Sequence, residues 1–400
     1  VGAYVALRGM ALNWQFAGSS MNDPLNNPFL KMGTTEWEPY SAGDKIATIG
    51  FILLKYLRLL VWPHPLTHDY YPFTIARQTL SAPLALTGLG VYAGLLLWAV
   101  WGLMKKWRLA FGLLLFLLPL LLVSNLLFPV GTFMAERFLF MPSAGFSLVF
   151  AAVLFGAFRR VRLPNWAPLG AAGLAAVALA ALTLLRNPAW KSNQSLMEAD
   201  LKASANSAKL NHSYGTLMLD QALVAVDTAR RSQLLRKSEE HLRKALSLHA
   251  SYYDAALAYG ACAFYLGDFD RSVMAYQGAY RVNPADPKSK TGLLYALRYG
   301  GQYFAGPGQD SARAVVYFTQ AWDIQPDTAL AAGLARHFSR YNQPQEAIAW
   351  LERGLALAPG DPGLTRALGA AYRSAGMPEK AANLGKQPSS FLIVPPSGGK

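Results

Sequence analysis

The sequence predicts an all-α protein in two parts, a bundle of membrane-spanning helices followed by a solenoid of paired helices. Long runs without a charged residue fill the first half, and small and aromatic residues recur about every 34 residues in the second. We assign residues 1–189 to the membrane part, 190–385 to the solenoid, and the Pro-, Ser- and Gly-rich residues 386–400 to a disordered tail. Charged residues make up 15% of the chain and apolar ones 53%, which excludes a wholly disordered protein.

Four stretches of the first half are long and apolar enough to cross the roughly 30 Å hydrocarbon core of a bilayer. Charged residues separate them, such as Lys105 after the first and Arg159 after the third. Buried helices of a soluble protein are disfavoured because the four runs follow one another so closely. The predicted spanning helices cover residues 83–104, 109–128, 138–158 and 165–185.

Positive charge sets the expected orientation of this bundle. Six Lys and Arg residues lie in the short connections 105–108 and 159–164. Short loops rich in such residues stay in the cytoplasm. The chain beyond Arg186 is therefore expected on the extracytoplasmic side, which is the periplasm in a bacterium or the lumen of the endoplasmic reticulum in a eukaryote.

Residues 46–62 are apolar but carry Lys55 and Arg58, which share one helix face. A spanning helix with snorkelling bases and an interfacial or re-entrant helix are both open, and we favour the second. The chain opens at Val1 with neither an initiator methionine nor a signal peptide. Its first residues read as the end of an apolar helix, so we expect further membrane helices before it.

The second half has the residue spacing of the tetratricopeptide repeat (TPR), in which two antiparallel helices stack on the next pair. Small residues let paired helices approach, aromatic residues fill the gaps between pairs, and a proline ends the second helix. The spacing from Pro284 to Pro326 exceeds one repeat, and the Gly- and Pro-rich segment 304–311 is predicted to form the longer turn that accounts for it. The repeated positions include Gly260, Tyr276, Ala314, Phe318, Ala347, Leu368 and Tyr372.

A TPR array is a scaffold for binding peptides and does not by itself indicate an enzyme. Arg298, Arg340 and Arg373 fall at nearly equivalent positions on the first helix of successive repeats. They form either a basic ladder that faces an extended peptide or carboxylate, or ordinary solvated surface. The net charge of +14 does not indicate nucleic-acid binding, because the basic residues gather at the membrane boundaries.

Four short motifs lie in the loops expected outside the cytoplasm. They are Asn27–Phe29 (N-P-F), Pro63–Tyr70 (P-H-P-L-T-H-D-Y), Glu136–Phe146 (E-R-F-L-F-M-P-S-A-G-F) and Arg186–Trp190 (R-N-P-A-W). In this order they resemble the transmembrane-and-TPR O-mannosyltransferase-like family, and the resemblance covers about residues 1–385. The motif at Glu136–Phe146 is the most specific of the four.

The resemblance implies the GT-C fold of membrane glycosyltransferases, of which this chain would be the C-terminal portion. Such enzymes move a sugar, here mannose-like, from a polyprenyl-phosphate carrier to a protein acceptor on the extracytoplasmic side. A carboxylate must take the proton of the attacking hydroxyl, and cations or a divalent metal must stabilise the departing lipid phosphate. The family places its key acidic residues in an earlier outer loop, so we expect the catalytic base upstream of Val1 and a chain that is inactive alone.

Four basic residues are candidates for holding the donor phosphate. His64, His68 and Arg77 lie near a predicted membrane surface, where a lipid phosphate would sit. Arg137 lies at the outer end of a spanning helix, where ionisable residues tend to be functional. Interfacial anchoring and snorkelling remain the simpler roles. The prolines at 63 and 65 spoil a regular helix, so we assign no metal site to the two histidines.

Three acidic residues are candidates for contacting or supporting the acceptor. Asp23 lies in the first outer loop, Asp69 follows the histidines, and Glu136 begins the most specific motif. Helix capping by Asp69 and a local ion pair of Glu136 with Arg137 are the simpler alternatives.

Two other functions stay open at the level of sequence. One is a non-catalytic, membrane-anchored TPR scaffold that assembles partners outside the cytoplasm. The other is an enzyme of the O-antigen or oligosaccharide ligase type, some of which also end in TPRs. The motif at Glu136–Phe146 disfavours the ligase only through the family resemblance.

Overall fold

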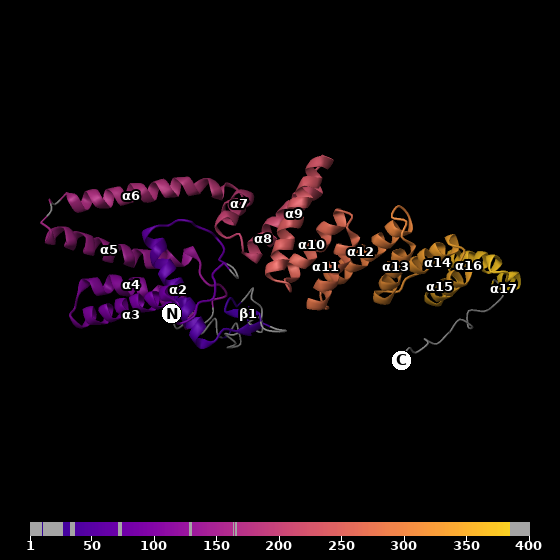
Figure 1. Ribbon diagram of the computed structural model, residues 1–400, viewed down its shortest axis with the longest axis horizontal. Coiled ribbons are helices and arrows are strands. Elements are labelled where there is room, and N and C mark those ends of the chain that lie inside the picture. The colour runs from indigo at the N-terminus through magenta and orange to yellow at the C-terminus, as the bar shows by residue number, and fades with distance from the viewer. Residues whose placement is uncertain are drawn as a thin grey trace. The chain divides into compact units, whose positions relative to one another are not determined.

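The computed structural model describes residue 10 and residues 27–32, 37–70, 74–127, 130–162, 164 and 166–384. These residues form two compact units (Figure 1), the first within residues 1–217 and 243–250 and the second within 218–242 and 251–400. The division falls later than the boundary near residue 190 suggested by the sequence, which stays a prediction. The expected tail, 386–400, lies outside the described residues.

The first unit consists of helices and one small hairpin among its described residues. The hairpin strands β1 (Leu30–Met32) and β2 (Trp37–Pro39) pair antiparallel, with Leu30 opposite Pro39. The helices are α2 (Ala42–Val61), α3 (Pro83–Met104), α4 (Arg108–Leu122), α5 (Phe140–Arg160), α6 (Ala167–Arg186) and α7 (Asn193–Ala203), with 3-10 helices η2 (Glu136–Leu139) and η3 (Asn187–Lys191). In Figure 1, α3 to α6 run along one direction, and the α3–α4 and α5–α6 turns lie at the same end of the unit.

Three helices in the described part of the chain are long and apolar enough to cross a membrane. They are Pro83–Met104, Glu136–Arg160 and Ala167–Lys191, which correspond to three of the predicted spans. The fourth prediction, 109–128, needs correction because α4 ends at Leu122 after 15 residues, or about 22 Å.

The early end of α4 has a local cause at Asn125. This residue adopts a positive φ of 62°, which an α-helix does not contain. Its side chain accepts a hydrogen bond from the Val130 N–H at 2.8 Å and donates to the Thr132 carbonyl at 2.9 Å. The chain therefore turns back on itself at Asn125 instead of continuing the helix.

Glycines allow two pairs of helices in this unit to pack very closely. A Cβ atom on Gly88 of α3 would lie 1.9 Å from the carbonyl oxygen of Gly50 in α2. A Cβ atom on Gly145 of α5 would lie 2.3 Å from the main-chain nitrogen of Phe116 in α4. Small residues at such crossings are typical of helices that pack within a membrane, where dispersion contacts between close backbones stabilise the pair.

Helix α2 begins four residues before the predicted segment 46–62 and has 20 residues. Figure 1 shows it running across the long helices rather than along them. Its buried face includes Ile49, Ile52 and Tyr56, which belong to the core of the first unit. This is the arrangement expected of a helix lying in the membrane interface, and that placement stays a prediction.

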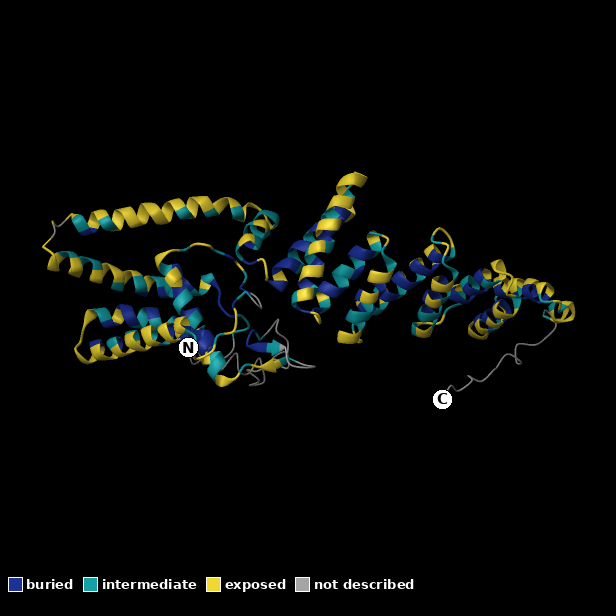
Figure 2. Ribbon diagram, viewed as in Figure 1, coloured by how far each residue is buried: buried dark blue, intermediate teal, exposed yellow. Residues whose placement is uncertain are grey.

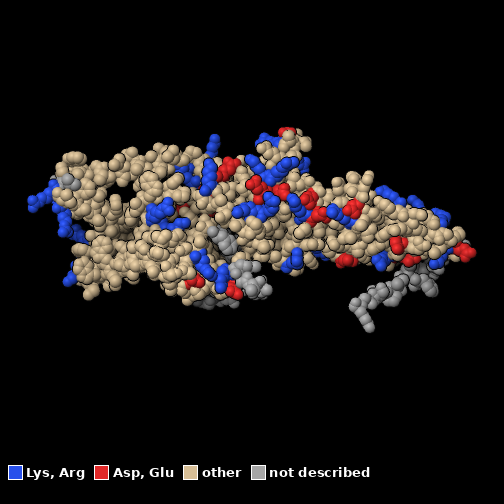
Figure 3. Space-filling model, viewed as in Figure 1, with Lys and Arg blue, Asp and Glu red and all other residues tan. Residues whose placement is uncertain are grey.

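The surface of α3 to α6 is strongly apolar, as expected for contact with lipid. Figure 2 shows α6 exposed along nearly all of its length, and its exposed residues include Leu174, Val177 and Leu184. At about 30 Å, α5 and α6 match the thickness of a bilayer core. Figure 3 shows Lys and Arg gathered at the end that carries the two short turns.

The second unit is a row of antiparallel helix pairs. It contains α10 (Tyr253–Tyr265) with α11 (Phe269–Val282), α12 (Pro287–Ala305) with α13 (Ser311–Ile324), α14 (Thr328–Arg340) with α15 (Pro344–Leu357), and α16 (Pro362–Ser374) with α17 (Pro378–Asn383). Helices α8 (Ala208–Val224) and α9 (Thr228–Leu248) form a preceding pair that belongs partly to each unit.

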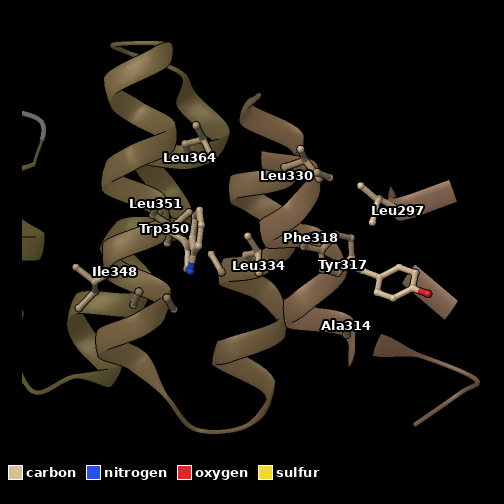
Figure 4. Close-up of a cluster of buried hydrophobic side chains, with 14 of the residues drawn as sticks. Leu297, Ala314, Tyr317, Phe318, Leu330, Leu334, Ile348, Trp350, Leu351 and Leu364 are labelled. Carbon is tan, nitrogen blue, oxygen red and sulfur yellow. The ribbon is translucent and has the colours of Figure 1, made fainter. Parts of the chain in front are cut away.

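One continuous apolar core joins successive pairs of the second unit. Figure 4 shows Phe318, Leu334 and Trp350 among the side chains that fill it from neighbouring helices. Tyr276 packs where Gly260 and Gly292 leave room, since a Cβ atom on either glycine would meet its ring within 3 Å. Aromatic residues thus fill the space that small residues leave, which is the packing that the repeat predicts.

The longer turn predicted at 304–311 is present between α12 and α13. Helix α12 ends at Ala305, and the N–H of Gly308 donates to the Tyr303 carbonyl at 2.8 Å. Asp310 then caps α13 by accepting from the Arg313 N–H at 3.0 Å. The all-α prediction, with membrane helices followed by a TPR solenoid, is confirmed.

Candidate functional site

A buried carboxylate gathers the polar groups at the end of the first unit opposite the basic turns. Asp200 lies in α7 and its side chain has no exposed surface. One carboxylate oxygen accepts from the main-chain N–H of His68 at 2.7 Å and contacts the His68 ring nitrogen Nδ1. The other oxygen accepts from Arg186, the last residue of α6. Asp200 therefore joins the loop after α2 to the end of α6.

These contacts shift the protonation of Asp200 and His68 in opposite directions. Burial alone would raise the pKa of Asp200, but hydrogen bonds from His68 and Arg186 outweigh it and hold that pKa below its usual range. The hydrogen bond to Asp200 raises the pKa of His68, and burial offsets the rise only in part. The site therefore favours a charged carboxylate beside a protonated imidazole.

Glu136, from the most specific sequence motif, holds the same loop from another side. One carboxylate oxygen accepts from the Thr67 N–H at 2.7 Å and from the Tyr70 hydroxyl at 2.9 Å. Thr67 and Tyr70 are both buried. The alternative of an ion pair between Glu136 and Arg137 is absent from the described contacts, and Arg137 lies over the ring of Phe138 at 5.3 Å.

Asp69 contacts the start of α8. Its carboxylate accepts from the Ser207 hydroxyl at 2.5 Å, and Ser207 in turn accepts from the Leu210 N–H at 3.0 Å. Burial raises the pKa of Asp69, while the Ser207 hydrogen bond and the charge of Lys209 oppose the rise. Asp69 therefore acts on α8 through Ser207, and the capping alternative stays a prediction because residues 71–73 lie outside the described residues.

His64 lines a small cationic pocket beside this network. The pocket has a volume of about 110 Å³, several times the 10–15 Å³ that one water needs. Lys55 and Arg58 of α2 also line it, and no carboxylate of the described chain forms an ion pair with either. Ser204, at the end of α7, closes the pocket with a buried hydroxyl that has no hydrogen-bond partner among the described residues. Two cations and an unused hydroxyl fit an anionic group such as phosphate.

The other predicted phosphate candidates lie elsewhere. Arg77 lies 4.0 Å from the Asp44 carboxylate at the start of α2 and over the ring of Tyr40. His64 follows the opposite end of that helix, roughly 25 Å away by helix length. Arg77 and His64 therefore cannot hold the same phosphate. Arg137 and His68 do not line the pocket, and Asp23 lies outside the described residues.

Of the three predicted ladder arginines, two approach one pocket of the second unit. Arg298 and Arg340 line it together with Arg336, whereas Arg373 does not. Arg298 forms an ion pair with Asp327, and Arg340 donates to the Ala305 carbonyl at 3.0 Å.

The described part of the chain offers no set of side chains that could bind a divalent metal. No group of three or more His, Cys, Asp or Glu side chains gathers there in a way that could hold a metal ion. We therefore assign no metal-binding residues and derive no step through a metal.

Sequence reasoning missed Asp200, Ser204, Ser207 and the role of Lys55 with Arg58 in the pocket. Lys55 and Arg58 could have been recognised from the sequence, because they share a helix face and precede the Pro63–Tyr70 motif. No sequence pattern points to Asp200 and the serines, since they lie in an ordinary amphipathic stretch. Their role follows only from the folding of α7 against the loop.

Fold and site together define the class of this protein: a multi-span membrane protein with a polar site that joins its loops to α7 and the start of α8, the helices that lead into a TPR solenoid. No protein-family model matches the chain. Curated relatives support the resemblance seen in the loop motifs, over part of the chain. The chain is similar to the human protein O-mannosyl-transferase TMTC1 (32% identity over 117 residues), the Drosophila melanogaster Tmtc3 (39% over 100) and the mouse TMTC4 (34% over 118).

Each match covers only a small part of this chain and a small part of the relative. They cover 28%, 24% and 29% of this chain and only 13%, 11% and 16% of the relatives. Solved structures that match part of the chain include MamA from AMB-1 (19% identity, 44% of this chain and 88% of that chain, TM-score 0.29) and YrrB, a TPR protein with an unusual peptide-binding site (15%, 49% and 94%, TM-score 0.29). The TPR assignment rests on the helix pairs and packing of this chain itself.

Proposed function

We propose that this chain is part of a membrane glycosyltransferase. It transfers mannose from a polyprenyl-phosphate carrier to a Ser or Thr hydroxyl of a protein acceptor on the extracytoplasmic side, and its TPR unit holds the acceptor. The observation that carries the proposal is the cationic pocket of Lys55, Arg58 and His64, which carries an unpartnered Ser204 hydroxyl. The partial similarity to protein O-mannosyl-transferases supports it.

The position of the pocket suits a lipid-linked phosphate. It lies at the end of α2, beside the network that joins the start of α5 to the end of α6. That end is separated from the basic turns by the length of α5, about 30 Å. A polyprenyl chain in the bilayer would bring its phosphate to this depth at the outer surface.

The reaction breaks the bond between the sugar anomeric carbon and the lipid phosphate oxygen. The acceptor hydroxyl oxygen forms the new bond to that carbon, its proton passes to a carboxylate base, and the lipid phosphate leaves as an anion. In this chain, Lys55 and Arg58 would stabilise the charge on the leaving phosphate, and the Ser204 hydroxyl would donate to one of its oxygens. The base is expected upstream of Val1, as the family resemblance implies.

The test uses membranes from cells that make the protein as its gene encodes it, supplied with polyprenyl-phosphate mannose. Mass spectrometry measures hexose on Ser and Thr of acceptor proteins. We expect Lys55→Ala and Arg58→Ala to reduce transfer about tenfold or more, because each removes a charge-assisted contact to the leaving group. Arg230→Ala, an exposed arginine of α9 outside the pocket, is the matched control.

Two outcomes would count against parts of this proposal. Transfer at the wild-type rate in both pocket variants would remove the phosphate role, and a loss in Arg77→Ala instead would move it to the other end of α2. If the wild-type protein transfers no sugar, the transferase function falls and the scaffold alternative takes its place.

A further inference from the structure

A pocket of about 410 Å³ lies between the first helices of two successive repeats, a volume in the range of pockets that bind small ligands. Its walls come from α12 and α14, and Phe318 of α13 contributes to it. The first helices of successive pairs line a shared surface in such solenoids, and extended ligands bind along it. The pocket belongs entirely to the second unit.

Three arginines and one acidic residue line this pocket. Asp327 is already engaged, since one of its oxygens caps α14 through the Leu330 N–H at 2.8 Å and the other pairs with Arg298. Arg336 is exposed and has no ion-pair or hydrogen-bond partner in the described part of the chain. The side chains that line the pocket therefore carry a net positive charge.

Buried polar atoms in the pocket wall also lack partners. His337 is 4% exposed, and its ring nitrogen Nε2 contacts the Ser311 hydroxyl at 2.8 Å. In the part of the chain that the structure describes, the second ring nitrogen, Nδ1, is buried without a partner, as is the Nε of Arg298. Unsatisfied polar atoms are costly in a protein interior and point to a missing partner such as a bound ligand.

The remaining wall is apolar and open in one place. Phe318, Leu330 and Ala305 supply hydrocarbon surface. A Cβ atom added to Gly333 of α14 would meet no atom within 4 Å, so this glycine faces empty space. A ligand that fits must carry a negative charge and an apolar group close to it.

We propose that this pocket binds a carboxylate of an acidic, extended peptide segment, with a neighbouring apolar side chain packed against Phe318 and Leu330. Arg336 and Arg298 pair with the carboxylate, and the surface between α12 and α14 takes the peptide backbone. Taking this peptide as part of the acceptor rests on the proposed function, whereas binding itself does not require sugar transfer.

The test measures peptide binding to the full chain in detergent or nanodiscs, with no sugar donor present. The probe is a fluorescein-labelled peptide of alternating glutamate and leucine, compared with the same peptide carrying glutamine. Each peptide is used with a free and with an amidated C-terminus, which separates side-chain carboxylates from a terminal carboxylate. We expect the glutamate peptide to bind at least about tenfold more tightly than its amidated glutamine counterpart.

Two substitutions act on the pocket in different ways. Gly333→Leu fills the open space and also favours the helix, because glycine is a poor helix former. Arg336→Glu reverses an exposed charge without touching the core. Each is expected to weaken binding about tenfold or more, while Arg230→Glu makes the same change of net charge outside the pocket and should leave binding unchanged.

Equal binding of the glutamate and amidated glutamine peptides, no binding of the glutamate peptide, or wild-type affinity in both pocket variants would overturn the proposal. Circular dichroism of each variant shows whether it is folded. Binding without sugar transfer would leave this inference standing and remove only the transferase function.

Discussion

Arg186, the last residue of α6, donates to the fully buried carboxylate of Asp200 in α7, so the end of a membrane helix is bonded to the helix that leads into the solenoid. His68 binds the other carboxylate oxygen from the loop after α2. Neither cation is fully buried, since their side chains are 19% and 36% exposed. Arg186 and His68 therefore depend on the same carboxylate for their ion pairs.

Asp200→Ala should destabilise the first unit by about 2–4 kcal/mol, because it leaves two cations and a main-chain N–H without their partner. Thermal unfolding in detergent, followed by circular dichroism, measures the change. Asp220→Ala, at an exposed position of α8, is the control and should have little effect. An unchanged melting temperature for Asp200→Ala would show that water replaces the carboxylate at little cost.

The contribution of His68 to stability should depend on pH. Because Asp200 raises its pKa in the folded protein, the contribution is fully present below the unfolded value near 6.5 and is lost as the pH rises through the folded value. The Asp200 pKa is lowered, so its contribution is present above about 3.8 and is lost as the pH falls through the folded value. The difference in melting temperature between wild type and His68→Asn should thus shrink as the pH rises above neutrality. A constant difference would contradict this interpretation.

Gly88→Ala should separate α2 from α3. The new Cβ atom would meet the Gly50 carbonyl oxygen at 1.9 Å, and backbone cannot move aside as a flexible side chain can. We expect a loss of about 1–3 kcal/mol in stability, the usual cost of overpacking. Gly94→Ala in the same helix adds a methyl group where no atom lies within 4 Å and should cost nothing. Equal melting temperatures of the two variants would show that the helices do not pack as closely as described.

The proposed orientation places the TPR unit outside the cytoplasm. Lys380→Cys, an exposed position of α17, should react in intact cells with a maleimide that cannot cross the membrane. Lys105→Cys, in the exposed turn between α3 and α4, should react only after the membrane is permeabilised. The native Cys262 is buried, so its background labelling should be low. The reverse pattern would remove the proposed side and, with it, access to a carrier in the outer leaflet.

Elements encoded by local pattern were predicted well. The helix Pro83–Met104 has the predicted ends because an uncharged run is bounded by a proline and two lysines. The longer turn between α12 and α13 followed from its glycine and proline content. The end of α4 was missed because Asn125 stops the helix through contacts with the loop that follows, and hydropathy does not report such contacts.

The site was predicted less completely for the same physical reason. His68 and Glu136 were identified from motifs, but Asp200 contacts residues that are 132 and 14 positions away in the sequence. A single aspartate in an amphipathic helix carries no local signal of a buried ion pair. Only the structure separates the phosphate candidates Arg77 and His64. Arg77 lies beside the start of α2, and His64 follows its end.

The bond between Arg186 and Asp200 has a practical consequence for dissecting the molecule. A fragment that begins at the solenoid boundary suggested by the repeats would keep α7 but lose the arginine and the histidine, which are the ion-pair partners of Asp200 in its first helix. A fragment that starts at α10, after Ala250, would lose α9, whose Leu235 and Leu242 share a buried cluster with Cys262 of α10, so the full chain is the better choice for peptide screening.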